Sequence, residues 1–308
     1  MDGIDISHYQ ETMNWDKTKA TGIRFAILKA SQGLTADSMF KTNSATCNLE
    51  YKGAYHFLDY TKMHYKLGEE EAFGVKQAQF FLQTISGWKH NLVAFLDIEN
   101  NPYWESLSDN ASRAKKIALA FEREYERQTG KKLGVYMNLS TTKFQEWAGL
   151  KREYVWRGFT DGPLWMAQYN ATMSLPYCWN KWHIWQKSES GNGALYGAGS
   201  AEIDLDIANP NTFGECITDE VAVEMPLPIP IPGEKLVKIR TVVTQGLRIR
   251  TTPQYVSWNL TGQSLNSGEI VEDMEEVTET KNGIAYIWGR IGHKQWTCIK
   301  EGNIDHVA

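Results

Sequence analysis

The chain of 308 residues has few cysteines, and they lie far apart. The four are Cys47, Cys178, Cys216 and Cys298, and no two of them form a CxxC pair. This spacing argues against a zinc site and gives no sign of a disulfide framework. We therefore expect free, buried thiols, and nothing in the sequence calls for a metal ion or an organic cofactor.

Long apolar runs, basic clusters and leader-like residues are also scarce. No apolar run approaches the roughly 20 residues of a membrane-spanning helix, so no membrane span is expected. With 32 basic and 37 acidic residues, the net charge of −5 argues against nucleic acid as a partner. The start, Met-Asp-Gly-Ile-Asp, lacks the basic and apolar regions of a signal peptide, which predicts synthesis in a cytoplasm, or secretion if a leader was removed.

Eight short, strand-like segments alternate with connecting segments in the first 215 residues, and they predict an α/β barrel. Two of the connections have helical periodicity, at residues 69–85 and 108–129. Ser108 or Asp109 can cap the start of the second helix, and Gly130 follows its end. The expected strands are residues 3–7, 24–29, 53–58, 93–99, 133–137, 164–169, 183–187 and 202–207.

The helical periodicity is lost after residue 169. Residues 188–200 are rich in Gly and Ser and predict a loop or hairpin in place of a helix. The predicted fold class is therefore α/β, an irregular TIM-like (β/α) parallel barrel over residues 1–217 whose helices are incomplete in the second half.

The composition changes again at residues 218–235, which include the alternating prolines of 226–232. Alternating prolines favour extended polyproline II, so this segment is predicted to be a semi-rigid linker. Residues 236–308 contain short β-like runs broken by Gly, Asn and Pro, and they predict a small all-β barrel domain.

Two carboxylates stand at the end of the fourth predicted strand. Residues two apart on a strand share a face at about 6.6–7 Å, so Asp97 and Glu99 should lie close together. Their repulsion would push one of them toward the protonated form that a general acid needs. The alternative is a helix N-terminus, where acids are common, but Asn100, Asn101 and Pro102 are typical of a loop.

These acids belong to a series of short motifs that resembles glycoside hydrolase family 25, the muramidases also called Chalaropsis-type lysozymes. The resemblance covers residues 2–213, and its one visible departure is Gln32, where the family usually has Glu. The motifs are Gly-Ile-Asp-Ile-Ser-His-Tyr-Gln at 3–10, Phe-Ala-Ile-Leu-Lys-Ala-Ser-Gln-Gly at 25–33, Gly-Ala-Tyr-His-Phe at 53–57, Phe-Leu-Asp-Ile-Glu at 95–99, Gly-Val-Tyr at 134–136, Leu-Trp-Met-Ala-Gln-Tyr at 164–169, Trp-Gln at 185–186 and Ile-Asp-Leu-Asp at 203–206.

The resemblance implies hydrolysis of the β-1,4 bond between N-acetylmuramic acid and N-acetylglucosamine in bacterial peptidoglycan. It implies Glu99 as the general acid and Asp97 as its stabilising partner, with Asp5 and Asp204 as further carboxylates of the groove. The family is generally described as retaining, by a covalent or a substrate-assisted route. Asp206 shares a face with Asp204, and we expect it to bind backbone while Asp204 faces the cleft.

The 12 tryptophans and 14 tyrosines are mostly expected in the core, but sugars also stack on flat rings. The predicted sugar-binding residues are Tyr55, Tyr136, Trp165 and Trp185, near the strand ends. Trp104 could be either such a platform or a surface anchor. His8 and His56 are expected to be structural.

The C-terminal segment resembles bacterial Src-homology-3-like wall-binding domains, through Gly-Leu-Arg-Ile-Arg-Thr-Thr-Pro at 246–253. The leading hypothesis is a phage endolysin made in a host bacterial cytoplasm and acting on the wall after release, and a bacterial autolysin fits the residues equally. The alternatives are a non-catalytic wall-binding protein and a chitinase-like N-acetylglucosaminidase. Host species, stem-peptide preference and oligomeric state stay open.

Overall fold

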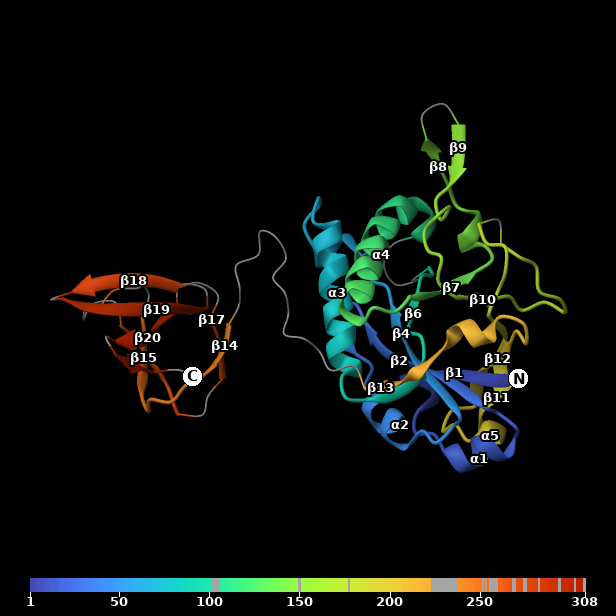
Figure 1. Ribbon diagram of the computed structural model, residues 1–308, viewed down its shortest axis with the longest axis horizontal. Coiled ribbons are helices and arrows are strands. Elements are labelled where there is room, and N and C mark those ends of the chain that lie inside the picture. The colour runs from blue at the N-terminus through green and yellow to red at the C-terminus, as the bar shows by residue number, and fades with distance from the viewer. Residues whose placement is uncertain are drawn as a thin grey trace. The chain divides into compact units, whose positions relative to one another are not determined.

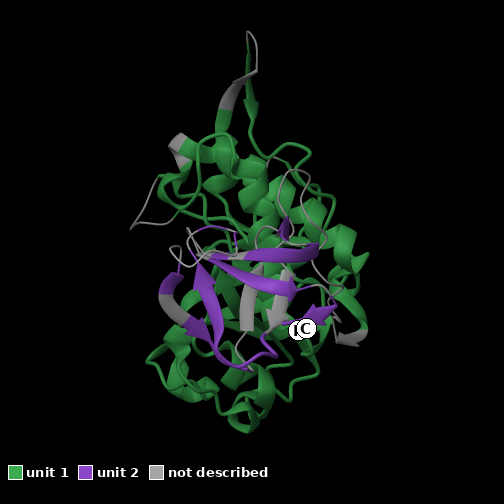
Figure 2. Cartoon of the chain, turned by 90° about the vertical axis from the view of Figure 1, so that its left-hand side faces the viewer, with its two compact units in different colours: residues 1–228 green, residues 229–308 purple. Residues whose placement is uncertain are grey.

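The chain forms two compact units, Met1–Pro228 and Ile229–Ala308 (Figure 2). The division falls inside the predicted linker, whose prolines at 226–232 lie outside the described residues, as does Trp104. The computed structural model describes residues 1–100, 106–148, 151–176, 178–222, 238–250, 252, 254, 260–267, 270–273, 276–281, 283–292, 295–301 and 303–306.

Eight strands of the first unit form a closed barrel, because β1 pairs with both β2 and β12. Each of them overlaps one of the eight predicted strands. In the order of the sheet they are β1 (Asp2–Ile6), β12 (Glu202–Ala208), β11 (Ile184–Asn192), β10 (Leu164–Ala167), β7 (Gly134–Asn138), β6 (Phe95–Asp97), β4 (Tyr51–Phe57) and β2 (Phe25–Gln32).

The eighth strand corrects the expectation of an all-parallel barrel. Seven strands run parallel to one another, but β12 is antiparallel to both β1 and β11. The chain reaches β12 directly from β11 through the tight turn around α5 (Gly193–Tyr196), and so short a connection allows only an antiparallel neighbour.

Side chains alternate between two separate cores, as the period of a strand requires. On β2, Phe25 and Ile27 belong to an apolar cluster inside the barrel, whereas Ala26 and Leu28 belong to the larger cluster between strands and helices. Gly3 makes room for the inner cluster, because a Cβ atom there would lie 2.2 Å from the Phe25 ring. The barrel is therefore filled with side chains below the level of the acidic residues.

The two long helices are α3 (Glu70–Ile85) and α4 (Leu107–Thr129), which lie side by side against the barrel (Figure 1). A Cβ atom at Gly74 would lie 2.2 Å from the carbonyl oxygen of Ile117, so a glycine is needed for this close packing. Both predicted helices are confirmed. The predicted cap of α4 was wrong, since Ser106 is the N-cap residue, while Gly130 ends the helix at φ 66°.

No helix in the part of the chain that the structure describes is both long and apolar enough to cross a bilayer. The other helices are short: α1 (Trp15–Ala20), α2 (Phe40–Thr46) and α5. The prediction of a loop or hairpin at residues 188–200 is confirmed by the antiparallel pair of β11 and β12, except that the short helix α5 lies in their connection. Single 3₁₀ turns are His8–Gln10, Lys62–His64, Thr141–Lys143 and Phe213–Cys216.

Five further strands belong to the first unit. Strand β13 begins at Ile217 and pairs with β5, so the start of the predicted linker is part of this unit. Strand β3 forms a hairpin with the end of β2. The five strands are β3 (Thr35–Ala36), β5 (Lys89–Leu92), β8 (Gln145–Ala148), β9 (Lys151–Tyr154) and β13 (Ile217–Ala222).

The described part of the second unit contains strands joined by turns and no helix, so its all-β class is as predicted, although its strands form two separate sheets and not one barrel. Six of them form one sheet and two form another, β14 with β17. The strands are β14 (Lys238–Thr241), β15 (Leu247–Arg250), β16 (Leu260–Leu265), β17 (Ile270–Asp273), β18 (Glu276–Lys281), β19 (Ile284–Gly292), β20 (Gln295–Glu301) and β21 (Ile304–Asp305).

All four cysteines of the chain are free thiols, and Cys47, Cys216 and Cys298 are buried.

Candidate active site

Acidic side chains from four parts of the chain meet at one end of the barrel. Asp5 is near the end of β1 and Asp97 is the last residue of β6. Because β12 is antiparallel, its early residues reach this same end, and Asp204 pairs with Asp5. Glu99 lies two residues beyond β6, so the strand is shorter than the predicted 93–99 and Glu99 is carried by the segment that follows it.

These carboxylates line a cavity of about 160 Å³, which we call the acid pocket. It is polar and holds several tyrosines besides the acids. Its lining residues are Asp5, Tyr55, Asp97, Glu99, Tyr136, Trp165, Tyr169, Gln186, Glu189 and Asp204.

The surroundings of Asp97 and Glu99 favour the protonated form of both carboxyl groups. Burial raises the pKa of Glu99 to about 7; Lys29 lowers it, and the charges of Asp204 and Glu189 raise it further. Burial also raises the pKa of Asp97, and the charge of Glu99 adds to this shift. Because two neighbouring buried carboxylates resist double ionisation, the pair retains a proton near neutral pH.

Asp5 is the centre of a second acidic group. Burial raises its pKa, and the charges of Asp204 and Asp206 raise it further. Burial also raises the pKa of Asp204 to about 6 and that of Asp206 to about 8. Because neighbouring buried carboxyl groups resist joint ionisation, this group also favours bound protons.

Gln186 fixes the orientation of Asp5. Its Nε2 atom donates to Asp5 Oδ2 at 2.8 Å. Its Oε1 atom accepts hydrogen bonds from the hydroxyl groups of Tyr136 at 2.9 Å and Tyr169 at 2.7 Å. Both ends of the Gln186 amide are therefore hydrogen-bonded. Gln186 holds Asp5 in place, and the hydroxyl groups of the two tyrosines hold Gln186 in place.

Lys29 supplies positive charge beside these acids. Its Nζ atom donates to Gln32 Oε1 at 2.8 Å and lies 4.7 Å from the centre of the Phe57 ring. Burial lowers the pKa of Lys29, against the charges of Asp97, Asp37 and Glu99, which raise it. In return Lys29 lowers the pKa values of Asp97 and Glu99 and so favours one ionised member of the pair.

A buried carboxylate pair with a retained proton, at the carboxyl ends of barrel strands, is the arrangement that glycosidic bond cleavage requires. The family model described as Glycosyl hydrolases family 25 matches residues 4–194. The chain belongs to glycosyl hydrolase family 25. The predictions of the family and of a glycoside hydrolase are therefore confirmed. The matched segment ends before β12, so Asp204 comes from outside it.

Relatives and solved structures agree with this family. Lysozyme M1 of Streptomyces globisporus is 27% identical over 213 residues, which are 66% of this chain and 65% of that protein. N,O-diacetylmuramidase of Chalaropsis sp. is 29% identical over 202 residues, 61% of this chain and 88% of that protein. The bacterial lysozyme from Streptomyces coelicolor has a TM-score of 0.53 and 25% identity, covering 68% of this chain and 92% of that one.

A structure of a family 25 glycosyl hydrolase from Bacillus anthracis shares the fold, with a TM-score of 0.53 and 23% identity over 69% of this chain and 91% of that one. This chain thus spans slightly less than two thirds of Lysozyme M1 but most of the other proteins compared.

Three of the four predicted sugar-binding aromatics line the acid pocket of this family 25 chain: Tyr55, Tyr136 and Trp165. Trp165 is only 1% exposed, and its ring packs edge-on against Tyr136 with centroids 4.6 Å apart. The structure places Trp185 elsewhere. Its indole donates to the carbonyl oxygen of Gln168 at 2.6 Å, and it is not a lining residue of the pocket.

The prediction that Asp206 binds backbone was wrong. Asp206 Oδ1 instead accepts a hydrogen bond from the Trp165 indole at 2.8 Å, deep inside the barrel. His56 is structural, as expected, because it is fully buried within hydrogen-bond distance of Ser31 and Gln77. His8 pairs with Asp37 at the surface.

Three lining residues were not predicted: Gln186, Tyr169 and Glu189. Gln186 lies one residue after Trp185, on the opposite face of β11. Gln186 shares a face of β11 with Ile184, an apolar residue of the inner cluster. This two-residue spacing is the signal in the sequence that places Gln186 inside the barrel. Glu189 follows a register shift in β11, where the strict alternation of side chains between the two faces fails.

No group of three or more potential metal ligands is found among the described residues.

Proposed function

We propose that this chain is an N-acetylmuramidase that hydrolyses the β-1,4 bond between N-acetylmuramic acid and N-acetylglucosamine in peptidoglycan. The observation that carries the proposal is Glu99, a half-buried carboxyl group beside Asp97 with a pKa raised to about 7 by burial. Such a group still holds its proton at neutral pH and can give it to a leaving oxygen. Relatives named lysozyme and N,O-diacetylmuramidase support the same substrate.

In the proposed mechanism, Glu99 protonates the glycosidic oxygen as its bond to the anomeric carbon breaks. Asp97 Oδ1 is buried and makes no hydrogen bond within the described part of the chain. An acceptor left free in this way suits the N–H of the substrate's 2-acetamido group. The acetamide oxygen then attacks the anomeric carbon, and water opens the resulting ring with the proton returning to Glu99, which gives overall retention.

The test is the chemistry of the new ends. Purified peptidoglycan is digested, reduced with borohydride and separated for mass analysis. We expect reduced muramic acid at every new end. Reduced glucosamine would contradict the proposal and favour the chitinase-like alternative, and intact glycan with free peptides would exclude a glycosidase action. Proton NMR of fresh product from a soluble oligosaccharide tests retention, which predicts the β-anomer first.

We also propose that the second unit anchors the enzyme to the cell wall. Its all-β structure and the sequence Gly-Leu-Arg-Ile-Arg at 246–250 support this. A tethered wall-binding unit raises the concentration of enzyme on an insoluble polymer without changing the active site. The endolysin role, with synthesis in a host cytoplasm, is likewise part of the proposal and rests on the sequence.

A further inference from the structure

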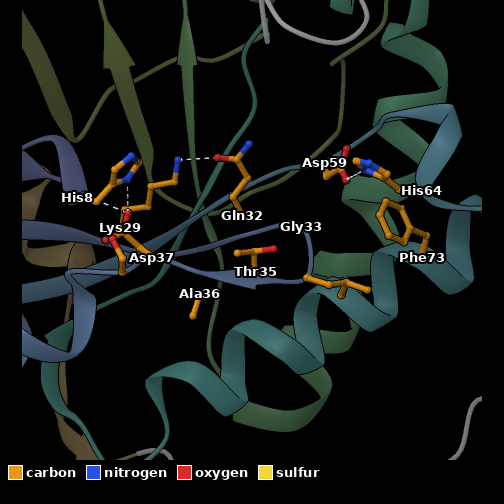
Figure 3. Close-up of a pocket in the computed structure, with 12 residues that line it drawn as sticks. His8, Lys29, Gln32, Gly33, Thr35, Ala36, Asp37, Asp59, His64 and Phe73 are labelled. Carbon is orange, nitrogen blue, oxygen red and sulfur yellow. Dashed lines mark hydrogen bonds and ion pairs between the residues drawn. The ribbon is translucent and has the colours of Figure 1, made fainter.

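A second cavity of about 690 Å³, larger than the acid pocket, has no part in the mechanism above (Figure 3). We call it the β3 pocket, because strand β3 crosses it. Its lining residues are His8, Lys29, Gln32, Gly33, Leu34, Thr35, Ala36, Asp37, Ser38, Asp59, His64 and Phe73.

The two acids of the β3 pocket are occupied by the protein itself. Asp37 Oδ2 accepts from the backbone N–H of His8 at 3.0 Å and lies 2.8 Å from its Nδ1. On the other side of Figure 3, the Asp59 carboxylate pairs with the ring of His64 through its Nδ1 atom. The carboxylates are almost fully buried while the two imidazoles are about half exposed, so the pocket presents imidazole rings, not free acids.

Between these pairs runs the hairpin of β2 and β3. Both residues of β3, Thr35 and Ala36, are exposed, and in the described part of the sheet β3 pairs with β2 alone. An exposed edge strand offers main-chain donors and acceptors to an extended peptide. Leu34, which is 50% exposed, adds apolar surface beside it.

The lining does not suit a sugar. Apart from the imidazoles, the one aromatic ring among the described lining residues is Phe73, and it is only 4% exposed. In the acid pocket, by contrast, Tyr169 is 48% exposed and offers a flat ring on which a sugar can stack. The β3 pocket therefore fits small apolar side chains on an extended backbone better than a further glycan unit.

Lys29 connects the two cavities. It lines the β3 pocket, where it donates to Gln32, and its charge acts on Asp97 and Glu99 of the acid pocket. Its ammonium group therefore places positive charge in the β3 pocket close to the acids that would cleave the sugar, which favours a sugar substituent that carries carboxylates.

We propose that the β3 pocket binds the peptide that peptidoglycan carries on its muramic acid residues, with the peptide backbone along β3. The inference rests on the proposed muramidase function and names the part of the substrate that this cavity recognises. It predicts that the enzyme cleaves peptide-bearing glycan strands faster than the same strands without peptides.

The test uses two substrates from one preparation: soluble glycan strands with their peptides, and the same strands stripped by an amidase. Ala36→Trp fills the pocket, Leu34→Asp places a negative charge at its mouth, and Ala20→Trp is the matched control, at the exposed end of α1. Thermal unfolding of each variant checks that it is folded.

For both pocket variants we expect kcat/KM on peptide-bearing strands to fall at least about tenfold and to change less than about twofold on stripped strands. Ala20→Trp should match the wild type on both. If the wild-type enzyme cleaves both substrates equally well, the pocket proposal is overturned and the muramidase function is unaffected. The same conclusion follows if the two pocket variants slow both substrates to the same extent, or slow neither substrate. Wild-type enzyme that produces no muramic acid ends from either substrate would instead overturn the proposed function itself.

Discussion

Asp204 lies directly opposite Asp5 across the antiparallel strand pair that closes the barrel. Burial raises the pKa of both carboxyl groups, and the charge of Asp204 raises that of Asp5 further, which keeps the acid pocket less negative than its acids suggest. A parallel eighth strand would have brought its last residues to this end instead. The reversed direction of β12 is therefore what adds Asp204 to the site.

Removing the proton donor should nearly abolish activity. Glu99→Gln keeps the shape of the side chain but cannot deliver a proton, so we expect wall-lytic activity to fall at least ~10²-fold. Glu189→Gln is the matched control, since Glu189 is an exposed acid at the same pocket, and it should stay within a few-fold of wild type. Turbidity loss of purified walls measures both, and a Glu99→Gln enzyme as active as the control would remove Glu99 from the mechanism.

The pH profile should report the coupling of Asp97 and Glu99. Glu99 acts while protonated, so the rate should decline as pH rises through about 7. In the Asp97→Asn variant, Glu99 loses its negative neighbour and keeps the positive charge of Lys29, so the pKa of Glu99 falls. The alkaline limb, which is the decline of the rate at high pH, should therefore move to lower pH. The measurement is kcat/KM on a soluble oligosaccharide, and an unmoved limb would show that the two acids are not coupled.

Removing the positive charge should have the opposite effect. Lys29 lowers the pKa values of both Asp97 and Glu99, so Lys29→Met should raise them and move the alkaline limb to higher pH. Lys29→Arg retains the charge and should leave the limb close to the wild-type position. If Met and Arg at this position gave the same profile, the role of Lys29 would be packing against Phe57 and not charge.

The stability of the protein should fall as pH rises. Burial raises the pKa of Asp206 to about 8, so the folded state holds a proton that the unfolded state releases near pH 4, and folding weakens between these values. Asp206→Asn can still accept from Trp165, and it should reduce the slope of unfolding free energy by up to about 1.4 kcal/mol per pH unit.

Urea unfolding at pH 5, 6, 7 and 8 checks this expectation. The exposed Asp16→Asn is the control for a lost carboxylate and should keep the wild-type slope. Equal slopes for wild type and Asp206→Asn would mean that Asp206 ionises normally inside the barrel.

Separating the two units should separate catalysis from wall binding. A chain ending at Pro228 keeps every residue of the acid pocket and the β5–β13 pair, so it should fold and cleave a short soluble glycan at nearly the wild-type rate. Lysis of whole walls should drop because the tether is lost. The isolated unit Ile229–Ala308 should sediment with walls and release no sugar, and failure of both results would favour a stabilising role for that unit.

Much of this molecule follows from local sequence patterns. Short apolar runs predicted all eight barrel strands, because burying a strand requires apolar side chains wherever the chain runs. Helical periodicity predicted α3 and α4 to within about two residues. The acids at positions 5, 97, 99 and 204 were chosen from motifs at strand ends, and the structure brings all four to one pocket.

Other features were not predicted. Trp185 was expected to bind sugar because of its aromatic ring, but it is Gln186 that shares the inward face of β11 with Ile184, and a shift of one residue exchanges the two faces. Asp206 finds its partner, Trp165, on a strand that does not neighbour β12 in the sheet, so no spacing along the chain predicts the contact.

The sequence by itself determined the strands, the two long helices and the acids that meet in the acid pocket, since hydrophobic period and carboxylate spacing are properties of a few adjacent residues. The tertiary structure alone decided the direction of β12, the burial that raises the pKa values of the acids, and the β3 pocket. Strand direction depends on the connection that the whole barrel permits, and a raised pKa depends on how much water the surrounding elements exclude. Both are set by residues far apart in the chain that meet only in the fold.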